Sequence, residues 1–432
     1  MTDAPAFAPG ARRALTHRVG SAELGAVAAL LGTDDPALGV RAAATLVTRL
    51  LVTHFPGPGT RLLREEFRYP GRLAEGDMVE VSAAVTERLP DGRLRLACRV
   101  LRVGEMEPVL DGLAEVAPPD APPGTETPFD THPRRMLNAL LARCAGRPAV
   151  PTAVVHPCDG RSLAGAMLAA RHGLIAPVLV GPETRIRAAA ETERLDLGGV
   201  EILSTPHSHA SAEAAVRLAA ERRVRALMKG SLHTDELMSA ALSRAAGLRT
   251  ERRVSHAFVM DAPLYPRLLV ITDAAINIAP DLEAKADIVR NAITLANAIG
   301  IELPRIAILS AVETVTPKLA STLEAAALCK MADRGQIGGG ILDGPLAFDN
   351  AVSEAAAKSK GIVSAVAGRA DVLVVPDIES GNMLAKQLAL LGGAETAGIV
   401  LGLHIPVALT SRSDDATSRL ASAALLRLTA RD

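Results

Sequence analysis

From residue 135 onward, short apolar runs alternate with stretches in which apolar side chains recur at helical spacing. Strands that alternate with helices of about 10 to 15 residues form a parallel sheet covered on both faces. The pattern therefore predicts a doubly wound α/β domain. The predicted helices are 135–147, 162–172, 183–195 and 211–222, and the predicted strands are AVVHP, APVLVG, VEIL, VRALMKG, 267–272, 305–310, 341–343, 372–375 and 398–403.

The first 116 residues have a different rhythm. One stretch with helical spacing, 40–54, is followed by four runs in which polar and apolar residues alternate, and LPDGR between two of them is a hairpin turn signal. The pattern predicts one helix wrapped by an antiparallel sheet, an α+β domain. The four predicted strands are 61–67, 78–88, 94–103 and 109–116.

A proline-rich segment separates the two patterns. APPDAPPGTETPFDTHP contains six prolines in seventeen residues, which disfavours both a helix and a central strand. We therefore expect a front domain at 1–116 and a linker at 117–135.

Composition excludes several classes of protein. A chain of 432 residues with a formal charge of −1, no Trp and two Tyr lacks the basic face and the stacking aromatics of a nucleic-acid surface. Its four cysteines show no CxxC spacing, so neither structural zinc nor a disulfide framework is expected. There is no signal-peptide core and no uncharged run of about 18 residues. We expect a cytoplasmic protein that does not bind a membrane.

The stretch LTSRSDD, residues 409–415, carries the strongest candidate chemistry. It follows the apolar run 398–410, and ligands of α/β proteins bind at the carboxyl ends of strands. Ser411 supplies a hydroxyl donor, Arg412 an anion clamp and Asp414 a candidate base, which together suit acyl or phosphoryl transfer. Alternatively, Ser413 or Asp414 only caps a helix that starts near Asp415.

The stretch LMKGSLHT ends a predicted strand in Lys229, followed by a Gly230 turn and by Ser231 or Thr234 at the start of a helix. A lysine beside a glycine turn at a helix N-terminus favours an anion, because the backbone donors and the helix dipole both attract negative charge. GxxxxGK[ST] is absent, so the motif does not indicate nucleotide hydrolysis.

Three further predicted strands or turns end in polar residues. In VITDAAINIAPD, Asp273 and Asn277 precede Pro280, which indicates a shaped loop or, alternatively, a pair of helix caps. ILDGPLAFDN has the same form, with carboxylates on either side of a Gly-Pro turn. In DIESGNMLAKQL, Gly381 lets a ligand approach the backbone, and Lys386 shares a helix face with Asn382.

Taken together, these segments resemble the phosphate acetyltransferase and phosphate butyryltransferase family. The resemblance runs in order from about residue 147 to the C-terminus. It rests on SLAGAMLAARHGLIAPVLVG, MKGSLHT, GLRTERRVSHAFVM, ITDAAINIAPDLEAKADI, AILSAVE, DGPLAFDNAVS, DVLVVPDIESGNMLAKQL and LTSRSD.

The resemblance implies a two-lobed fold like that of isocitrate and isopropylmalate dehydrogenases, with a cleft between the lobes. One lobe would be 136–248 plus 399–432, and the other, 249–398, would form the dimer interface. The implied reaction moves an acyl group between coenzyme A and inorganic phosphate, with acyl phosphate as product. It needs no metal and no permanently bound cofactor.

The resemblance also implies roles for residues in a direct transfer. Arg412 would clamp phosphate with help from Lys229 or Lys386, and Ser411 would donate to the reacting sulfur or the developing oxyanion. Asp414 would take the thiol proton of coenzyme A, a group with a pKa near about 8.5. Acetyl-type members carry an arginine near the positions of Met238 and Ser239, which this chain lacks. The spacing of the acidic residue also varies, so Asp415 is a rival to Asp414.

The front domain resembles the hotdog domain of MaoC-type enoyl-CoA hydratases. Their catalytic Asp and His stand in a GDxNPxH motif, where this chain has Thr33 and Leu38. Neither side chain can abstract a proton, so hydration would require Asp34 or Asp35 as a substitute. We expect a structural or dimerising module.

Two other functions remain in competition. Decarboxylating dehydrogenation of a hydroxy acid would need a carboxylate cluster for a metal and a Tyr and Lys pair, and the chain offers only Tyr69 and Tyr265 and no tight aspartate triad. An inactive protein that binds coenzyme A or acyl phosphate is the other alternative, which the intact Ser411 and Arg412 disfavour.

Overall fold

The computed structural model describes residues 7–20, 24–25, 27–28, 38–103, 105, 107–119, 135–263, 265–410 and 414–430. Contacts divide the chain into two compact units, Met1–Asp130 and Thr131–Asp432. Each unit has its own hydrophobic core and is described by itself.

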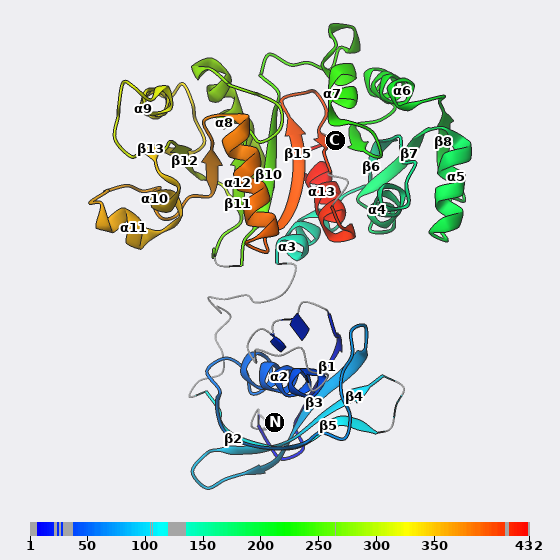
Figure 1. Ribbon diagram of the computed structural model, residues 1–432, viewed down its shortest axis with the longest axis vertical. Helices are drawn as coiled ribbons and strands as arrows, with labels where there is room; N and C mark the ends of the chain where they lie inside the picture. Colours follow the sequence, from blue (N-terminus) through cyan, green and yellow to red (C-terminus); the bar gives the residue numbers. More distant parts are fainter. Residues whose placement is uncertain are drawn as a thin grey trace. The chain divides into compact units, whose positions relative to one another are not determined.

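The front unit is a five-stranded antiparallel sheet in the order β1-β3-β4-β5-β2, against which helix α2 packs (Figure 1). The predicted helix and all four predicted strands are confirmed. Alternation in β3 and β4 turns every second side chain toward the core, including Val81, Leu94 and Leu96. The elements are β1 (Arg12–Arg18), α2 (Leu38–Thr53), β2 (Arg61–Arg68), β3 (Met78–Arg88), β4 (Leu94–Arg102) and β5 (Pro108–Ala117).

Strand β1 was not predicted from the sequence. It pairs with β3 at the edge of the sheet, and most of its side chains stay exposed or half-buried. An edge strand with so little buried surface carries no clear period-2 pattern of apolar residues, which is the signal that identified the other strands.

The second unit is built on one eleven-stranded sheet in the order β13-β12-β14-β11-β10-β15-β16-β9-β6-β7-β8 (Figure 1). Every predicted strand is present, but β10 and β16 were not predicted, and no helix separates β10 from β11 or β15 from β16. The strands are β6 (Val150–Val155), β7 (Ile175–Gly181), β8 (Glu201–Ser204), β9 (Ala226–Lys229), β10 (Ser255–Asp261), β11 (Leu269–Thr272), β12 (Arg305–Leu309), β13 (Ile341–Leu346), β14 (Val372–Val374), β15 (Glu395–Leu401) and β16 (Val407–Ala408).

Helices cover both faces of this sheet. They are α3 (Arg135–Cys144), α4 (Gly160–Arg171), α5 (Glu183–Thr192), α6 (Ser208–Ala220), α7 (Thr234–Leu242), the 3₁₀ helix η1 (Arg244–Ala246), α8 (Leu282–Ala298), α9 (Ala320–Asp333), α10 (Phe348–Val352), α11 (Glu354–Ser359), α12 (Ile378–Leu390) and α13 (Ala416–Thr429).

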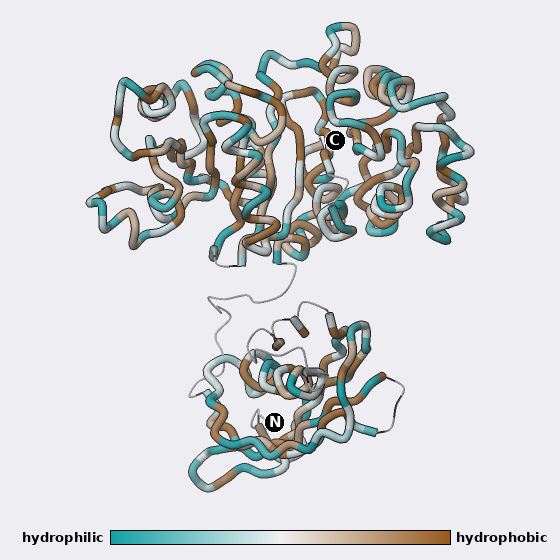
Figure 2. Tube along the Cα trace, viewed as in Figure 1, coloured by the Kyte–Doolittle hydropathy of each residue, from teal (hydrophilic) through white to brown (hydrophobic). Residues whose placement is uncertain are grey.

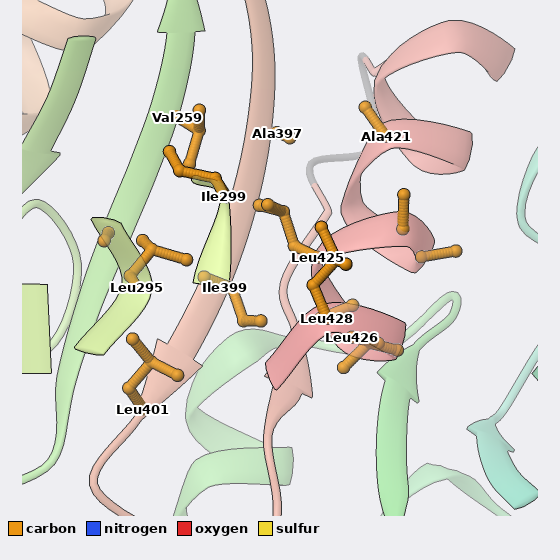
Figure 3. Packing of buried hydrophobic residues seen from close by; sticks show 14 of the residues in the cluster. Val259, Leu295, Ile299, Ala397, Ile399, Leu401, Ala421, Leu425, Leu426 and Leu428 are labelled. Atoms are coloured by element: carbon orange, nitrogen blue, oxygen red, sulfur yellow. The ribbon is translucent and has the colours of Figure 1, made fainter. Parts of the chain in front are cut away.

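Buried apolar residues hold these layers together. Figure 2 shows hydrophobic segments along the strands and hydrophilic segments along the peripheral loops. Figure 3 shows the middle of the core, where Val259 of β10 and Ile399 of β15 lie between Leu295 of α8 and Leu425 of α13. In the part of the chain that the structure describes, no helix combines the length and apolarity needed to cross a membrane.

The prediction of a wholly parallel sheet is wrong in the middle. β10 is antiparallel to both β11 and β15, and β15 is antiparallel to β16. The apolar run 398–410 therefore forms parts of two strands instead of one, and the chain reverses near Gly402, whose φ is 93°. Short buried strands of either direction read as apolar runs, so the sequence did not reveal the reversal.

Strand direction sets where the polar strand ends lie. β6, β9 and β16 run parallel to one another, whereas the three reversals through β15, β10 and β11 turn β11, β14, β12 and β13 the other way. The carboxyl ends of β6, β9 and β16 thus share one edge of the sheet, and those of β11 and β14 share the opposite edge. The boundary expected between residues 398 and 399 falls inside β15.

Candidate active site

The residues predicted to do the chemistry, Ser411 and Arg412, lie outside the described residues. Both flanks of the segment are described: Thr410 follows β16, and Asp414 precedes α13. β16 pairs in parallel with β9, so the chain enters the segment beside the end of β9. The predicted strand-end position of LTSRSDD is therefore visible at its two flanks.

Lys229 ends β9 in direct contact with Thr410. Its Nζ donates to the carbonyl oxygen of Thr410 at 3.2 Å and to that of Gly230 at 3.4 Å. The Thr410 hydroxyl donates in return to the Lys229 carbonyl at 3.4 Å. Lys229 is only 4% exposed and Thr410 only 3%. Burying an ammonium group is costly unless it is hydrogen-bonded, so these carbonyl contacts are needed to hold a cation here.

Gly230 makes the turn after β9 possible. A Cβ atom at this position would lie 2.5 Å from the carbonyl oxygen of Val155, at the end of the neighbouring strand β6. The Gly230 amide donates to that same oxygen at 2.9 Å. Glycine is therefore required by the close approach of two strand ends. Thr234 is the first residue of α7, after His233 as the N-cap.

Asp159 joins the same edge of the sheet from the end of β6. It caps α4, accepting from the Ser162 amide at 2.9 Å and the Ser162 hydroxyl at 2.8 Å. Burial acts to raise the pKa of Asp159, but hydrogen bonds from Ser162 and Ser231 and the charge of Arg419 together lower it below the ordinary value. Asp159 is therefore held as a carboxylate. Sequence reasoning missed it, because a capping Asp looks the same with or without a site beside it.

The two carboxylates after the segment have different surroundings. Asp415 is the N-cap of α13 and accepts from the Ser418 amide at 2.7 Å. The alternative prediction, in which Ser413 or Asp414 caps this helix, is therefore wrong: the cap is Asp415, one residue after Asp414. The carboxylate of Asp414 is half-buried, and its backbone carbonyl accepts from Arg419.

Arg419 is a second residue that sequence reasoning missed. It lies in the first turns of α13, is 3% exposed, and donates from Nη1 to the Thr410 hydroxyl at 2.9 Å. Burial lowers the pKa of its guanidinium below the ordinary value, while Asp414, Asp159 and Asp415 oppose that effect. The signal available in the sequence was its helix, which is largely apolar from Leu420 onward and includes only Ser422, Arg427 and Thr429 as polar residues. A helix that is apolar around most of its circumference is buried, and its charged residues are buried with it.

A second polar group lies at the opposite edge, after β11. Asn277 donates from Nδ2 to the Val254 carbonyl at 2.8 Å, and its Oδ1 accepts from Arg253 at 2.8 Å. Asp273 accepts the amides of Ala275 and Asn277. Burial raises the pKa of Asp273, and these hydrogen bonds counteract part of the rise. The amide and the carboxylate together fix the shape of the loop, as the proposed shaped loop requires.

Helix α12 packs onto that loop. The Asn382 Nδ2 donates to the Ala274 carbonyl at 3.1 Å. This hydrogen bond links the start of α12 to the loop after β11, and both segments contain predicted site residues. A Cβ at Gly381 would lie 2.6 Å from the carbonyl oxygen of Asp273. The close approach that this glycine permits is thus made by the protein's own backbone, where we had expected a ligand. Lys386, one turn further on, is exposed, and Pro280 is buried just before α8.

The arrangement at the β6, β9 and β16 edge can hold an anionic ligand. The flanks of the segment that contains Arg412 lie beside the buried ammonium of Lys229 and the buried guanidinium of Arg419. The carboxylates of Asp159 and Asp415, which cap α4 and α13, lie at the same edge. Within the described ranges, no group of three or more His, Cys, Asp or Glu side chains could hold a metal ion.

Comparisons with known proteins place this unit among acyltransferases. Residues 208–426 match the family model described as phosphate acetyl/butaryl transferase. The chain is 60% identical over 300 residues to a phosphate acetyltransferase of Rhizobium meliloti, covering 69% of this chain and 95% of the relative. It is 38% identical over 296 residues to a phosphate butyryltransferase of Clostridium acetobutylicum, covering 68% and 98%.

A solved structure agrees with these relatives. The branched-chain phosphotransacylase from Enterococcus faecalis V583 superposes with a TM-score of 0.57 at 29% identity, covering 65% of this chain and 100% of that chain. The phosphotransacetylase from Streptococcus pyogenes has a TM-score of 0.59 at 23% identity, which bears on the fold alone.

Proposed function

Because this chain belongs to the phosphate acetyl/butyryl transferase family, we propose that it moves a short acyl group between coenzyme A and inorganic phosphate. The observation that carries the proposal is the 60% identity that extends over 95% of a phosphate acetyltransferase. Acyl-CoA, phosphate and acyl phosphate are then the ligands of the site, and coenzyme A is a substrate, not a resident cofactor.

The proposed reaction is a direct transfer in a ternary complex. A phosphate oxygen attacks the thioester carbonyl, the carbon-sulfur bond breaks, and the acyl group leaves on phosphate while coenzyme A departs as a thiolate that takes up a proton. In the reverse direction Asp414 takes the thiol proton before the thiolate attacks. Ser411 donates to the developing oxyanion or to sulfur, and Arg412 clamps phosphate.

The surroundings of the segment support these roles. Lys229 and Arg419 are both buried at the edge at which the segment begins, and two cations favour a ligand with about two negative charges. Asp414 directly follows the segment and is half-buried, whereas Asp415 is exposed and caps α13, so we propose Asp414 as the base. The proposed sites on the other half of the sheet are Asn277, Asn382 and Lys386, which would meet the substrate across a cleft between the lobes.

The activity predicts thiol release that depends on phosphate. With acetyl-CoA or butyryl-CoA as substrate, addition of inorganic phosphate should raise the rate of CoASH formation at least about tenfold above the rate without phosphate. A thiol reagent measures the product, and sulfate replaces phosphate in the control. Binding of coenzyme A without any phosphate-dependent release would instead favour the inactive binding protein.

We propose that the front unit is a structural module of the hotdog type. Thr33 and Leu38 replace the Asp and His that hydratases of this type use, and neither can act as a base. Those two positions have no described side chains. Hydratase activity through Asp34 or Asp35 is the alternative.

We also propose the two-lobed, dehydrogenase-like arrangement and a homodimer formed through the 249–398 lobe. Several large apolar side chains of that lobe are exposed, among them Leu319 and Leu323, which are spaced to share a face near the start of α9. Exposed apolar patches in a folded chain often mark an interface.

The dimer proposal predicts that Leu323→Glu yields monomers. A carboxylate in an apolar contact would have to be desolvated, which costs more than a typical interface residue contributes. Light scattering after size exclusion measures the mass. Val103→Glu, which changes an exposed apolar residue of the front unit, is the control and should leave the mass unchanged. A Leu323→Glu protein with the mass of the wild type would exclude this face.

A further inference from the structure

Arg419 occupies a place in the core that the rest of the fold leaves open for it. It is the fourth residue of α13, and α13 packs against α3, α4 and β15. On α4 the residue opposite is Gly165, where a Cβ atom would lie 2.7 Å from the Cδ of Arg419 and 3.2 Å from its Cβ. A larger residue at position 165 would collide with the arginine stem. The buried path of Arg419 therefore depends on two helices.

The guanidinium at the end of that path contacts both flanks of the segment 411–413. Nη1 donates to the Thr410 hydroxyl at 2.9 Å, and Nε donates to the Asp414 carbonyl at 3.3 Å. Thr410 is the last residue before the segment and Asp414 the first after it. Because a guanidinium is planar and its donors are fixed relative to one another, the two bonds set the separation of the flanks.

The charge of Arg419 also reaches the other strand ends at this edge. Asp159 caps α4 after β6; burial acts to raise its pKa, but the hydrogen bonds from Ser162, the Ser231 hydroxyl of the turn after β9 and the charge of Arg419 together lower the pKa below its ordinary value. Arg419 is in turn stabilised by Asp414, Asp159 and Asp415. One buried cation is thus linked to the loops that follow β6, β9 and β16.

We propose that Arg419 is a positioning residue for the proposed transfer. It acts through the two described flanks, Thr410 and Asp414, which its guanidinium holds at a fixed separation, and the transfer by the residues between them depends on that separation. The inference rests on the proposed function. Catalysis is sensitive to such placement, because an error of about 1 Å in a positioned group can cost about a hundredfold in rate.

Lysine and methionine at position 419 test the proposal. Lysine keeps the charge but has a single nitrogen, so it cannot hold both flanks in a fixed geometry, and methionine keeps most of the volume without any donor. We expect Arg419→Met to lower kcat about a hundredfold and Arg419→Lys about tenfold, and both to raise KM for phosphate less than Arg412→Ala does, because the arginine clamp is displaced but still present. If the Arg419→Met protein does not fold, the kcat of the Arg419→Lys protein tests the proposal.

A double-mutant cycle with Thr410→Val separates positioning from general stability. If Arg419 acts through Thr410, the double variant should be no slower than Arg419→Met alone, because the shared bond is lost once. The matched control is Arg427→Met, which removes another buried arginine, 2% exposed, two turns along the same helix. It should lower the melting temperature and leave kcat unchanged.

Three outcomes would contradict the inference: wild-type kcat in Arg419→Met, effects of the two variants that multiply in the double variant, or an equal loss of kcat in Arg427→Met. The wild type is measured in the same assay. A wild type without phosphate-dependent thiol release refutes the proposed function, whereas an active wild type with an equally active Arg419→Met protein refutes only the inference.

Discussion

Ser411→Ala should lower kcat about a hundredfold while KM for phosphate stays within about threefold of the wild type. A hydrogen-bond donor aimed at a developing oxyanion or thiolate stabilises the transition state more than the bound substrates, and its loss typically costs about 3 kcal/mol. Arg412→Ala should behave differently, raising KM for phosphate itself, because an arginine clamp binds the anion in both the ground state and the transition state.

The contrast between the two variants is measured by initial rates at several phosphate concentrations. Ser413→Ala, two residues further on, is the matched control for Ser411 and should stay near the wild-type kcat. If the Ser411 and Arg412 variants both kept wild-type rates, the reaction centre would have to be sought elsewhere, beginning with Lys229 and Asn277.

The position of this segment beside Lys229 could be predicted from the sequence, because parallel strands carry their carboxyl ends to one edge. LMKG and VALT each read as an apolar strand followed by polar residues, and the pairing of β9 with β16 joins them. The rule depends only on strand direction and so survives errors in strand boundaries.

The same rule failed between the two halves of the sheet. Asn277 and Asn382 also follow buried strands or begin helices, yet β11 runs opposite to β9, so their strand ends point to the other edge. The two strands that reverse the direction, β10 and β15, are buried on both faces and carry no period-2 alternation. Direction is a property of pairing over long sequence separations, which a local pattern does not contain.

Residues that act through packing were the hardest to predict. Gly165 and Arg419 lie far apart in the sequence, and neither stands out in its own helix. Their relation exists only because α4 and α13 cross at that point. The sequence correctly indicated that another group closely approaches the backbone at Gly381. That group is the backbone of Asp273, whereas the sequence analysis predicted a ligand.

Lys229→Met should lower kcat/KM for phosphate at least about a hundredfold with little change in melting temperature. Methionine fills a similar volume, so the packing around the end of β9 is kept while the positive charge is removed. A buried ammonium costs desolvation energy, whereas its removal leaves the carbonyl oxygens of Thr410 and Gly230 without this donor, so the two effects on stability partly cancel. A lysine kept here only for stability would therefore be replaceable at no cost to activity.

Lys285 provides the matched control, since it is also 4% exposed but forms an ion pair with Glu324 between α8 and α9. Lys285→Met strands that carboxylate and should lower the melting temperature, with kcat/KM of the folded protein unchanged. Thermal unfolding and initial rates should therefore give opposite patterns for the two variants. Lys229→Met should lose activity and keep its melting temperature, whereas Lys285→Met should lose melting temperature and keep its activity. If Lys229→Met lost stability and kept its rate, the ammonium would serve only to join β9 to Thr410, and Arg412 would be left as the principal cation for phosphate.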